Sequence, residues 1–274
     1  MKLLCVTTVP ISLHFLLKGQ LQFMNQKFET IGVSSGPREE LEVVAKREGI
    51  EVRQVEMSRA ITPLKDLKSI WQLYKLFKKE QPIIVHTHTP KAGITGMLAA
   101  NLAGVPIRLH TLHGMPLMES NGIRRKILKV VEKLTYYYSS KIYPVSLSLK
   151  DFIIENGLVT PSKVSVIAGG SCNGIDTQFF NSDKISEEKK RKLKNKLKIQ
   201  SSDFVFVFVG RLVGDKGINE LVSAFKSVSI EKGFRGRLKL LLVGPLESDL
   251  DPLQTDTLRE IKNNTAIIAT GFQK

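Results

Sequence analysis

The chain is poor in cysteine and in aromatic residues, and it has no long apolar segment. Its 274 residues include two cysteines, Cys5 and Cys172, and aromatic residues make up 7% of the total. Two cysteines build no disulfide framework, which suits a reducing cytoplasm. No apolar run approaches the roughly 20 residues that a membrane-spanning helix needs. Pro10 and His14 interrupt the apolar N-terminal stretch, so we expect a strand over Lys2–Thr7 instead of a signal peptide.

Acidic residues are scarce relative to basic ones. The chain has 41 Lys and Arg against 26 Asp and Glu, a formal charge of +15. This balance favours acidic partners, namely nucleic acid, anionic lipid head groups or phosphorylated substrates. The few aromatic residues are not interleaved with the basic clusters as base-stacking platforms would be, which argues against nucleic acid. A non-catalytic basic module that binds nucleic acid or an anionic membrane stays an alternative.

Strand and helix patterns alternate along most of the chain. The expected strands are Lys2–Thr7, Glu29–Val33, Glu51–Val55, Ile83–Thr87, Arg108–Leu112, Lys141–Val145, Lys163–Ile167, Phe204–Val209, Leu238–Val243 and Ala266–Ala269. The expected helices are Ser12–Asn25, Pro37–Glu48, Pro63–Lys79, Lys91–Ala103, Arg124–Tyr138, Leu147–Asn156, Asn219–Ile230 and Leu253–Asn263. Repeated β-α units of this length predict an α/β fold, with parallel sheets and helices on both faces.

The alternation stops at Ser182–Ser202, which contains seven lysines and one arginine. We interpret this stretch as an exposed linker helix between two domains. The predicted organisation is a first domain at residues 1–180, a basic linker at 181–202 and a second domain at 203–274. The second domain looks incomplete, because a doubly wound half needs more strands than residues 203–274 supply.

The stretch Phe204–Gly217 joins an apolar strand to a glycine-rich basic loop. Its six β-branched or aromatic residues predict a central parallel strand that is buried on both faces. The loop that follows, GRLVGDKG, lies where open α/β sheets bind ligands, and it carries Arg211 and Lys216. It matches neither the P-loop nor the dinucleotide fingerprint. We interpret it as an anion site, with phosphate as the expected guest, or else as an ordinary turn with solvated cations.

Four of the five histidines fall at the ends of two successive strands. His86 and His88 are two residues apart and therefore face the same side of a strand. His110 and His113 end the next strand, so the four are expected to converge. Zinc is conceivable because imidazole is a common ligand. No cysteine or carboxylate pattern accompanies the histidines, so we expect a polar cleft lining with core packing, and no metal.

Three further segments have both a structural and a functional interpretation. Asp249–Asp251 could bind a metal, but Pro252 predicts a helix start with Asp251 as its N-cap. The helix expected at Arg124–Tyr138 either packs on the sheet with a solvated face or docks on an anionic membrane. NGID, residues 173–176, reads by itself as a turn. In the helix expected at Arg124–Tyr138, the cations are Arg124, Arg125, Lys126, Lys129 and Lys133, and the apolar residues include Ile127, Leu128, Val131 and Leu134. Three apolar residues expected to be exposed precede this helix, namely Met115, Leu117 and Met118.

Taken in order, these segments resemble the retaining glycosyltransferases of family four. The segments are HTHTPKAG, TLHG, NGID, VGRLVGDKGINELVSAF, LLLVG and TGF, and the similarity runs through essentially the whole chain. The resemblance implies the GT-B fold, in which two Rossmann-like domains face each other across a cleft. It is nearest to bacterial enzymes that build capsule, lipopolysaccharide or exopolysaccharide units on a polyprenyl-diphosphate lipid from nucleotide-sugar donors.

The resemblance assigns donor binding to the second domain. Arg211 and Lys216 would bind the donor diphosphate and stabilise the departing nucleotide as catalytic residues. Gly210 belongs to the same loop, and Gly244, which ends the LLLVG strand, would approach the base or ribose of the donor. The resemblance implies no metal and no cofactor, because fixed cations can oppose the charge that develops on the leaving group.

The resemblance assigns the acceptor side to the first domain. His113 in TLHG would line this side near the reacting carbon, with Gly114 beside it. The loop that begins at Thr8, after the first strand, would face the same cleft. Asn173 and Asp176 of NGID would lie at the crossover between the domains.

The chain departs from the family in one respect. Family members carry a Glu, seven residues, Glu motif further along, and this chain ends before that motif and before the family's closing helix. We therefore expect a C-terminally truncated chain that lacks on the order of a hundred residues. We also expect its donor affinity to be reduced or absent.

The sequence thus predicts an enzyme that transfers a hexose or N-acetylhexosamine. The expected donor is a UDP-sugar, and the expected acceptor is a polyprenyl-diphosphate-linked sugar or glycan in bacterial surface polysaccharide synthesis. The expected location is the cytoplasm, peripheral to the anionic inner membrane face, to which the charge of +15 is suited. Besides the basic binding module, a nucleotide-sugar epimerase of the same fold is an alternative, and it would need no acceptor.

Overall fold

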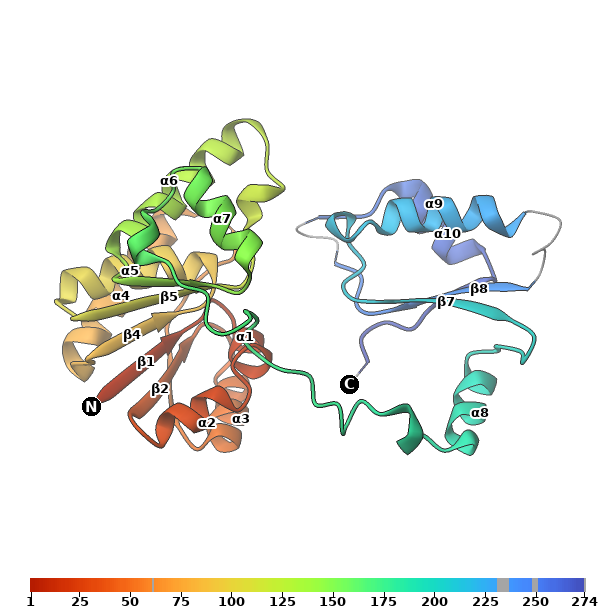
Figure 1. The fold of residues 1–274 in the computed structure, drawn as a ribbon, viewed down its shortest axis with the longest axis horizontal. Coiled ribbons are helices and arrows are strands. Elements are labelled where there is room, and N and C mark those ends of the chain that lie inside the picture. Colours follow the sequence, from red (N-terminus) through yellow and green to blue (C-terminus); the bar gives the residue numbers. More distant parts are fainter. Residues whose placement is uncertain (61, 231–236, 248–250, 274) are drawn as a thin grey trace. The chain divides into compact units, whose positions relative to one another are not determined.

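The computed structural model describes residues 1–60, 62–230, 237–247 and 251–273. The chain forms two compact units, Met1–Ile175 and Asp176–Lys274, which divide within NGID. Each unit has its own parallel sheet and is described by itself (Figure 1). Of the helices in the described residues, none has both the length and the apolar character needed to cross a membrane.

The first unit is built on a six-stranded parallel sheet in the order β3-β2-β1-β4-β5-β6. Its strands are β1 (Lys2–Val6), β2 (Glu29–Ser34), β3 (Glu51–Gln54), β4 (Ile84–Thr87), β5 (Ile107–Leu112) and β6 (Lys141–Pro144). The strands are added outward on one side of β1 and then on the other side. The carboxyl ends of β1 and β4 therefore flank the switch point at which sheets of this kind bind ligands.

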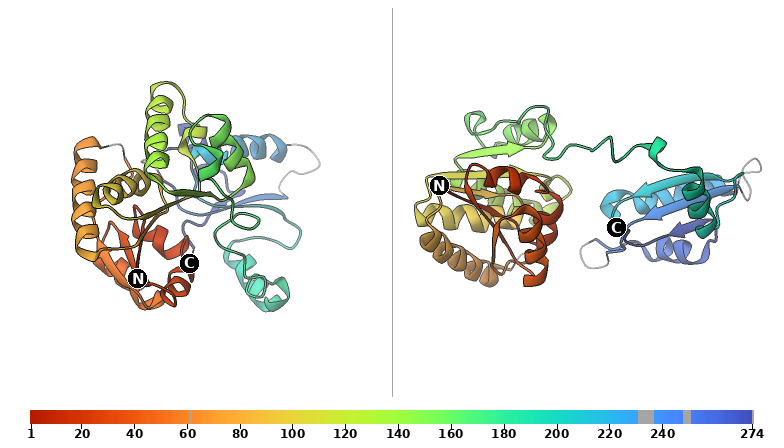
Figure 2. Two further views of the ribbon diagram at one scale, coloured as in Figure 1. Left: turned by 60° about the vertical axis from the view of Figure 1, so that its left-hand side comes forward. Right: turned by 90° about the horizontal axis from the view of Figure 1, so that it is seen from below.

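Helices cover both faces of this sheet. The helices are α1 (Pro10–Phe15), α2 (Gln20–Asn25), α3 (Arg38–Glu48), α4 (Pro63–Glu80), α5 (Pro90–Ala103), α6 (Gly122–Tyr138) and α7 (Leu147–Glu155). Helix α1 contacts α3, while α4, α5 and α6 contact one another in succession (Figures 1 and 2). Leu4 of β1 shares a buried cluster with Phe77 of α4, whereas the next residue, Cys5, shares one with Leu41 of α3. This alternation places the core on both sides of the sheet.

Two expected elements of the first unit are wrong. The helix expected over Ser12–Asn25 is broken between α1 and α2, where Gly19 adopts a φ of 75°. Such a backbone favours glycine and ends a right-handed helix. The strand expected over Lys163–Ile167 is reduced to a single bridge between Ile142 and Val164.

The second unit contains a three-stranded parallel sheet, β7-β8-β9, within the described residues. Its elements are α8 (Glu187–Lys196), β7 (Phe204–Val209), α9 (Ile218–Ser229), β8 (Leu238–Val243), α10 (Thr255–Asn263) and β9 (Ile267–Ala269). The helix expected in the basic linker forms as α8 and has no buried residue. Helices α9 and α10 lie on the same side of the sheet (Figure 1). Leu240 of β8 is buried in one cluster with Val222 and Phe225 of α9.

The prediction that Phe204–Val209 is a central strand buried on both faces is wrong. β7 lies at the edge of the described three-stranded sheet, and Phe204 and Val209 are 60% and 74% exposed. Apolar β-branched residues mark a segment that can be buried, but burial on both faces requires cover on both. In the described residues β7 pairs only with β8, and the cluster with α9 lies on one face.

Candidate functional site

The first candidate region lies at the carboxyl edge of the sheet in the first unit. His86 and His88 project from the end of β4 with their ring centroids 4.0 Å apart. His88 Nδ1 lies 3.3 Å from Nε2 of His113, which follows β5. His113 Nδ1 in turn lies 3.3 Å from the Sγ atom of Cys172. The three histidines and one thiol form a row from the centre of the sheet to the end of the unit.

The expectation that all four histidines converge is wrong for His110. In the parallel register His110 pairs with Thr87, so its side chain shares the face of Thr87 and lies opposite His86 and His88. His110 Nδ1 lies 2.8 Å from Thr87 Oγ1. A Cβ atom on Gly93 of α5 would lie 2.8 Å from the His110 ring, so the glycine allows α5 to pack against it.

Burial keeps the row of imidazoles neutral. It lowers the pKa of His86 to about 3 and that of His113 to about 4, while the pKa of His88 falls well below its ordinary value. Neighbouring imidazoles add to this effect at His86 and His88. At neutral pH His113 therefore offers one N–H donor and one acceptor nitrogen instead of a positive charge. Across the described residues, no three His, Cys, Asp or Glu side chains are grouped so as to hold a metal ion.

The other two acceptor-side residues differ in exposure. Thr8 is 3% exposed, and its N–H and hydroxyl meet Thr89 Oγ1 at 2.9 and 2.6 Å. The N–H of Ala92 also donates to the Thr8 hydroxyl, so Thr8 ties the loop after β1 to the start of α5. Gly114 is exposed, and a side chain there would meet no atom within 4 Å. Contact with an acceptor stays a prediction for both residues.

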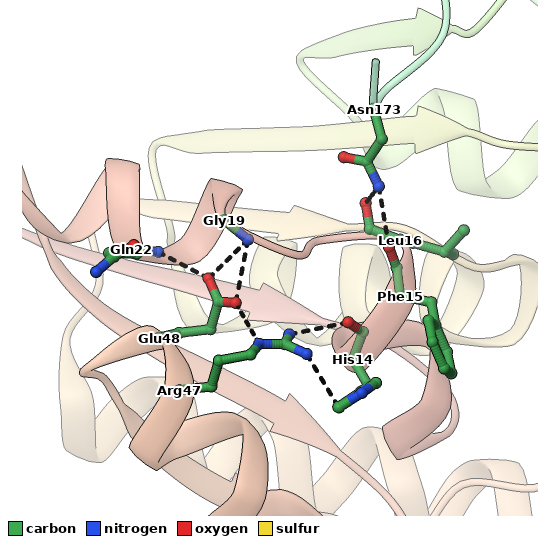
Figure 3. Close-up of polar contacts among 8 residues, drawn as sticks. All are labelled: His14, Phe15, Leu16, Gly19, Gln22, Arg47, Glu48 and Asn173. Atoms are coloured by element: carbon green, nitrogen blue, oxygen red, sulfur yellow. Dashed lines mark hydrogen bonds and ion pairs between the residues drawn. The ribbon is translucent and has the colours of Figure 1, made fainter. Parts of the chain in front are cut away.

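Asn173 anchors the end of the first unit to the loop between α1 and α2. Its Nδ2 donates to the carbonyls of Phe15 and Leu16 at 2.9 and 3.0 Å (Figure 3). Gln20 Nε2 donates to Asn173 Oδ1 and to the carbonyl of Cys172. These bonds place Cys172 beside His113. Asp176, across the division between the units, accepts from the N–H groups of its own turn.

The same loop is held from its other side by Glu48, which sequence reasoning did not identify. The carboxylate is 2% exposed and accepts from the N–H groups of Gly19 and Gln22 and from Nε of Arg47 at 2.7 Å (Figure 3). Burial alone would raise the pKa of Glu48, but the bonds from Gly19, Gln22 and Arg47 outweigh it and lower the pKa. Arg47 also contacts Nδ1 and the carbonyl of His14. The sequence offered no signal beyond an Arg-Glu pair at a helix end.

The second candidate region is the loop after β7 in the second unit. Arg211 Nη1 lies 2.8 Å from Glu247 Oε2, and Lys216 Nζ lies 3.6 Å from Asp215 Oδ2. Both basic side chains are about half exposed, at 43% and 46%. The start of α9 follows directly after Lys216 and Gly217, and the first N–H groups of a helix attract anions. The loop thus presents two accessible cations and a helix N-terminus at the carboxyl end of β7.

Gly210 and Gly244 lie side by side where β7 and β8 end. The N–H of Gly210 donates to the carbonyl of Val243 at 2.9 Å, and the N–H of Gly244 donates to that of Gly271 at 3.0 Å. A Cβ atom on Gly244 would lie 1.8 Å from the carbonyl oxygen of Gly210. Gly244 is therefore required for the close approach of the two strand ends, and its contact with a donor stays a prediction.

The prediction that Asp251 is the N-cap of a helix is wrong. α10 begins at Thr255, and Asp251 Oδ2 instead accepts from the N–H of Asp215 at 2.5 Å. The Asp251 carbonyl also accepts from the N–H of Gly214. Asp251 therefore fixes the loop that carries Arg211 and Lys216. Its companion Asp249 lies outside the described residues.

Comparison with protein families gives a match over most of the first unit. The model of a family described as Glycosyltransferase Family 4 matches residues 22–179. The chain is 36% identical over 255 residues to the capsular polysaccharide biosynthesis glycosyltransferase CapM of Staphylococcus aureus, covering 92% of this chain and 64% of that protein. It is 39% identical over 160 residues to the UDP-Gal:alpha-D-GlcNAc-diphosphoundecaprenol alpha-1,3-galactosyltransferase of Escherichia coli, covering 57% and 39%. The chain thus spans less than two thirds of the length of either relative.

Solved structures share the fold along the whole chain. HepE of Anabaena, in complex with UDP-glucose, superposes with a TM-score of 0.75 at 18% identity, covering 100% of this chain and 70% of that one. MnaA of S. aureus with UDP gives a TM-score of 0.64 at 15% identity, covering 99% and 68%. These likenesses confirm the expected α/β, GT-B-like fold with two parallel sheets.

Proposed function

The chain belongs to glycosyltransferase family 4, and we propose that it transfers a hexose or an N-acetylhexosamine from a UDP-sugar with retention of configuration. The acceptor is a polyprenyl-diphosphate-linked sugar or a growing glycan of a bacterial surface polysaccharide. Support comes from the relatives: CapM is named for capsular polysaccharide, and the E. coli enzyme is named for UDP-Gal and a diphosphoundecaprenol-linked sugar. The α-1,3 linkage in that name, made from an α-linked donor, is the outcome that retention gives.

The observation that carries the proposal is the loop after β7. As the glycosidic bond breaks, negative charge develops on the leaving nucleotide, and fixed cations oppose that cost. Arg211 and Lys216 are accessible on one loop, whose backbone Asp251 holds in place. In the structure, the guanidinium of Arg211 donates to the carboxylate of Glu247. A donor diphosphate would replace Glu247 in that contact.

On the acceptor side, the proposal gives His113 a neutral role. Because burial lowers its pKa to about 4, the imidazole is uncharged at neutral pH. A neutral imidazole beside the exposed backbone of Gly114 does not attract the donor diphosphate, and to orient a sugar hydroxyl it would exchange its contact with His88 or with Cys172. Thr8 and Asn173 would shape this edge by holding the surrounding loops, as their hydrogen bonds to Thr89 and to the carbonyl of Phe15 support.

The proposed location is the cytoplasmic face of the inner membrane, where polyprenyl-linked acceptors are embedded. The formal charge of +15 supports this location, since each basic residue near an anionic surface contributes about 1 kcal/mol of attraction.

The test is transfer by the full-length protein from labelled UDP-sugars to polyprenyl-diphosphate-sugar acceptors. We expect Arg211→Ala and Lys216→Ala each to lower kcat by about a hundredfold, the usual cost of removing one charge-stabilising group. Lys262→Ala, at an exposed cation near the end of α10, is the matched control and should leave transfer unchanged. Full activity in both loop variants would refute the site assignment.

The two alternatives give different products in the same experiment. An epimerase would convert the UDP-sugar in the absence of acceptor, and structures of UDP-GlcNAc 2-epimerases do share the fold, with a TM-score of 0.58 for the Neisseria meningitidis enzyme. A binding module would convert no sugar at all and would bind anionic polymers in a salt-sensitive manner. Product formation that requires both donor and acceptor separates the proposal from both.

A further inference from the structure

Helix α6 carries a row of apolar side chains that faces solvent. Ile123, Ile127, Val130, Leu134 and Tyr137 follow a spacing of four, three, four and three residues, which places them on one face of the helix. All five are between 41% and 77% exposed. The helix packs on the unit with a different face, on which Glu132, Thr135 and Tyr136 are buried. The apolar row is therefore not part of the core, although α6 packs on the unit with its other face.

Cations accompany the apolar row along the exposed part of α6. Arg124, Lys126, Lys129 and Lys133 are all exposed, and in the described residues none of them forms a salt bridge. The acidic residue of the helix, Glu132, is on the buried face. The exposed surface of α6 thus combines apolar and basic side chains without an acidic one, which matches an anionic and partly apolar partner.

The first turn of α6 strengthens this match. It holds no acidic residue, and Asn121 provides no side-chain cap. Basic side chains at the positive end of a helix dipole are unfavourable for the helix itself. An anion beside Arg124 and Lys126 would relieve this repulsion, so the N-terminal end of α6 gains from the same kind of partner.

The chain places this end of α6 close to the first candidate region. The 3-10 turn Pro116–Met118 leads from Gly114 towards α6, and Arg125 donates to the carbonyls of Leu117 and Ser120. Met118 in this turn is 51% exposed, whereas Met115 and Leu117, expected to be exposed, are buried. Figure 2 shows the start of α6 and the preceding turn standing out from the rest of the unit.

We propose that the exposed face of α6, extended by Met118, docks in the interface of an anionic lipid bilayer. The apolar row enters the boundary of head groups and acyl chains, and the flanking cations contact lipid phosphates, as in interfacial amphipathic helices. A membrane fits better than a folded protein partner because the row is narrow, flanked by long flexible cations and without an acidic or hydrogen-bonding pattern to specify a partner. Insofar as it brings His113 and Gly114 to a lipid-linked acceptor, the docking rests on the proposed function.

The test is sedimentation of the full-length protein with phosphatidylcholine vesicles that contain or lack phosphatidylglycerol. We expect the variant with Ile123→Ser, Val130→Ser and Tyr137→Ser to lower the partition coefficient on anionic vesicles by at least about tenfold. The matched control is Val43→Ser on α3, which removes a similarly exposed apolar side chain from a helix outside the α4, α5 and α6 series. It should leave binding unchanged.

A charge variant tests the second half of the surface. Lys126→Gln, Lys129→Gln and Lys133→Gln together should lower binding to anionic vesicles about a hundredfold, at about fivefold per cation. The wild type should bind neutral vesicles weakly, and added salt should weaken its binding to anionic ones. Unchanged binding in both triple variants would overturn the proposal. So would conversion of a dimer to a monomer by the serine variant with vesicle binding intact, which would assign the row to a second copy of the chain.

A second measurement separates docking from catalysis. With a short-chain, water-soluble acceptor, the α6 variants should transfer sugar as the wild type does, whereas with an acceptor embedded in anionic vesicles they should be slow. Absence of transfer in the wild type with normal vesicle binding would contradict the proposed function and leave the docking surface standing. Equal activity of variants and wild type on the embedded acceptor would contradict its role in catalysis.

Discussion

Replacing Glu132 by Gln should stabilise the first unit at alkaline pH and have little effect at acidic pH. Glu132 on α6 is 3% exposed, and burial raises its pKa from 4.5 to about 7. Between these two values the folded chain keeps a proton that the unfolded chain has released. Stability therefore falls as pH rises through this window, and the loss is complete above about pH 7.

The magnitude follows from the difference between the two pKa values. A difference of about 2.5 units, at about 1.36 kcal/mol per unit, amounts to about 3 kcal/mol. Gln has a similar shape and no charge to bury, so the variant escapes this loss. Relative to wild type, the free energy of unfolding of Glu132→Gln should rise by about 3 kcal/mol between about pH 4 and about pH 8.

Tryptophan fluorescence provides the assay, because the single Trp of the chain, Trp71, lies on α4 in the first unit. Urea unfolding followed at this residue reports on the first unit alone. Glu155→Gln, which changes an exposed acid at the end of α7, is the control and should follow the wild-type pH profile. An equal effect of Glu132→Gln at both pH values would refute the assignment of a raised pKa to Glu132.

Two further substitutions test contacts that hold the candidate regions. Gly244→Ala should destabilise the second unit by about 3 kcal/mol, because its Cβ would overlap the Gly210 carbonyl. Thermal melting followed by circular dichroism measures this loss, with Gly114→Ala as the control that should not change stability. An unchanged melting profile of Gly244→Ala would contradict the contact. Glu48→Gln should lower the free energy of unfolding of the first unit by about 3 kcal/mol, because it leaves Arg47 and the loop N–H groups without their carboxylate. Trp fluorescence in urea measures this loss. A change below about 1 kcal/mol would contradict a structural role for the carboxylate.

The sequence predicted the succession of elements well because the patterns that specify them are local. Alternating apolar residues and spacings of three and four located most helices and strands of both units. Errors arose where distant contacts decide the outcome. Gly19 breaks a helix that periodicity alone continues, and its N–H is bound by Glu48, 29 residues away. β7 has the composition of a central strand, but its exposure depends on which elements lie beside it.

As with the helices and strands, the sequence located some residues of the candidate regions correctly and misplaced others. Arg211 and Lys216 could be located because an apolar strand followed by a glycine-rich loop places them at the carboxyl end of β7, whereas their role in donor binding stays a prediction. Asp251 was wrongly predicted to be an N-cap, since its role depends on a contact with a loop 36 residues earlier in the chain. His110 was misplaced because strand alternation fixes its face only when the register with Thr87 is known.

The row of histidines illustrates how such distant contacts bear on chemistry. His88 and His113 are both neutral and meet through Nδ1 and Nε2, so one of the two nitrogens carries the shared proton. If His88 donates, His113 Nε2 accepts, and the proton of His113 lies on Nδ1, directed at Cys172. If His113 donates, its Nδ1 must accept from the thiol. Burial raises the pKa of Cys172 and keeps the thiol protonated, so the thiol can either donate to His113 Nδ1 or accept from it. The tautomer of His113 is therefore coupled to the direction of its contact with a residue 59 positions away.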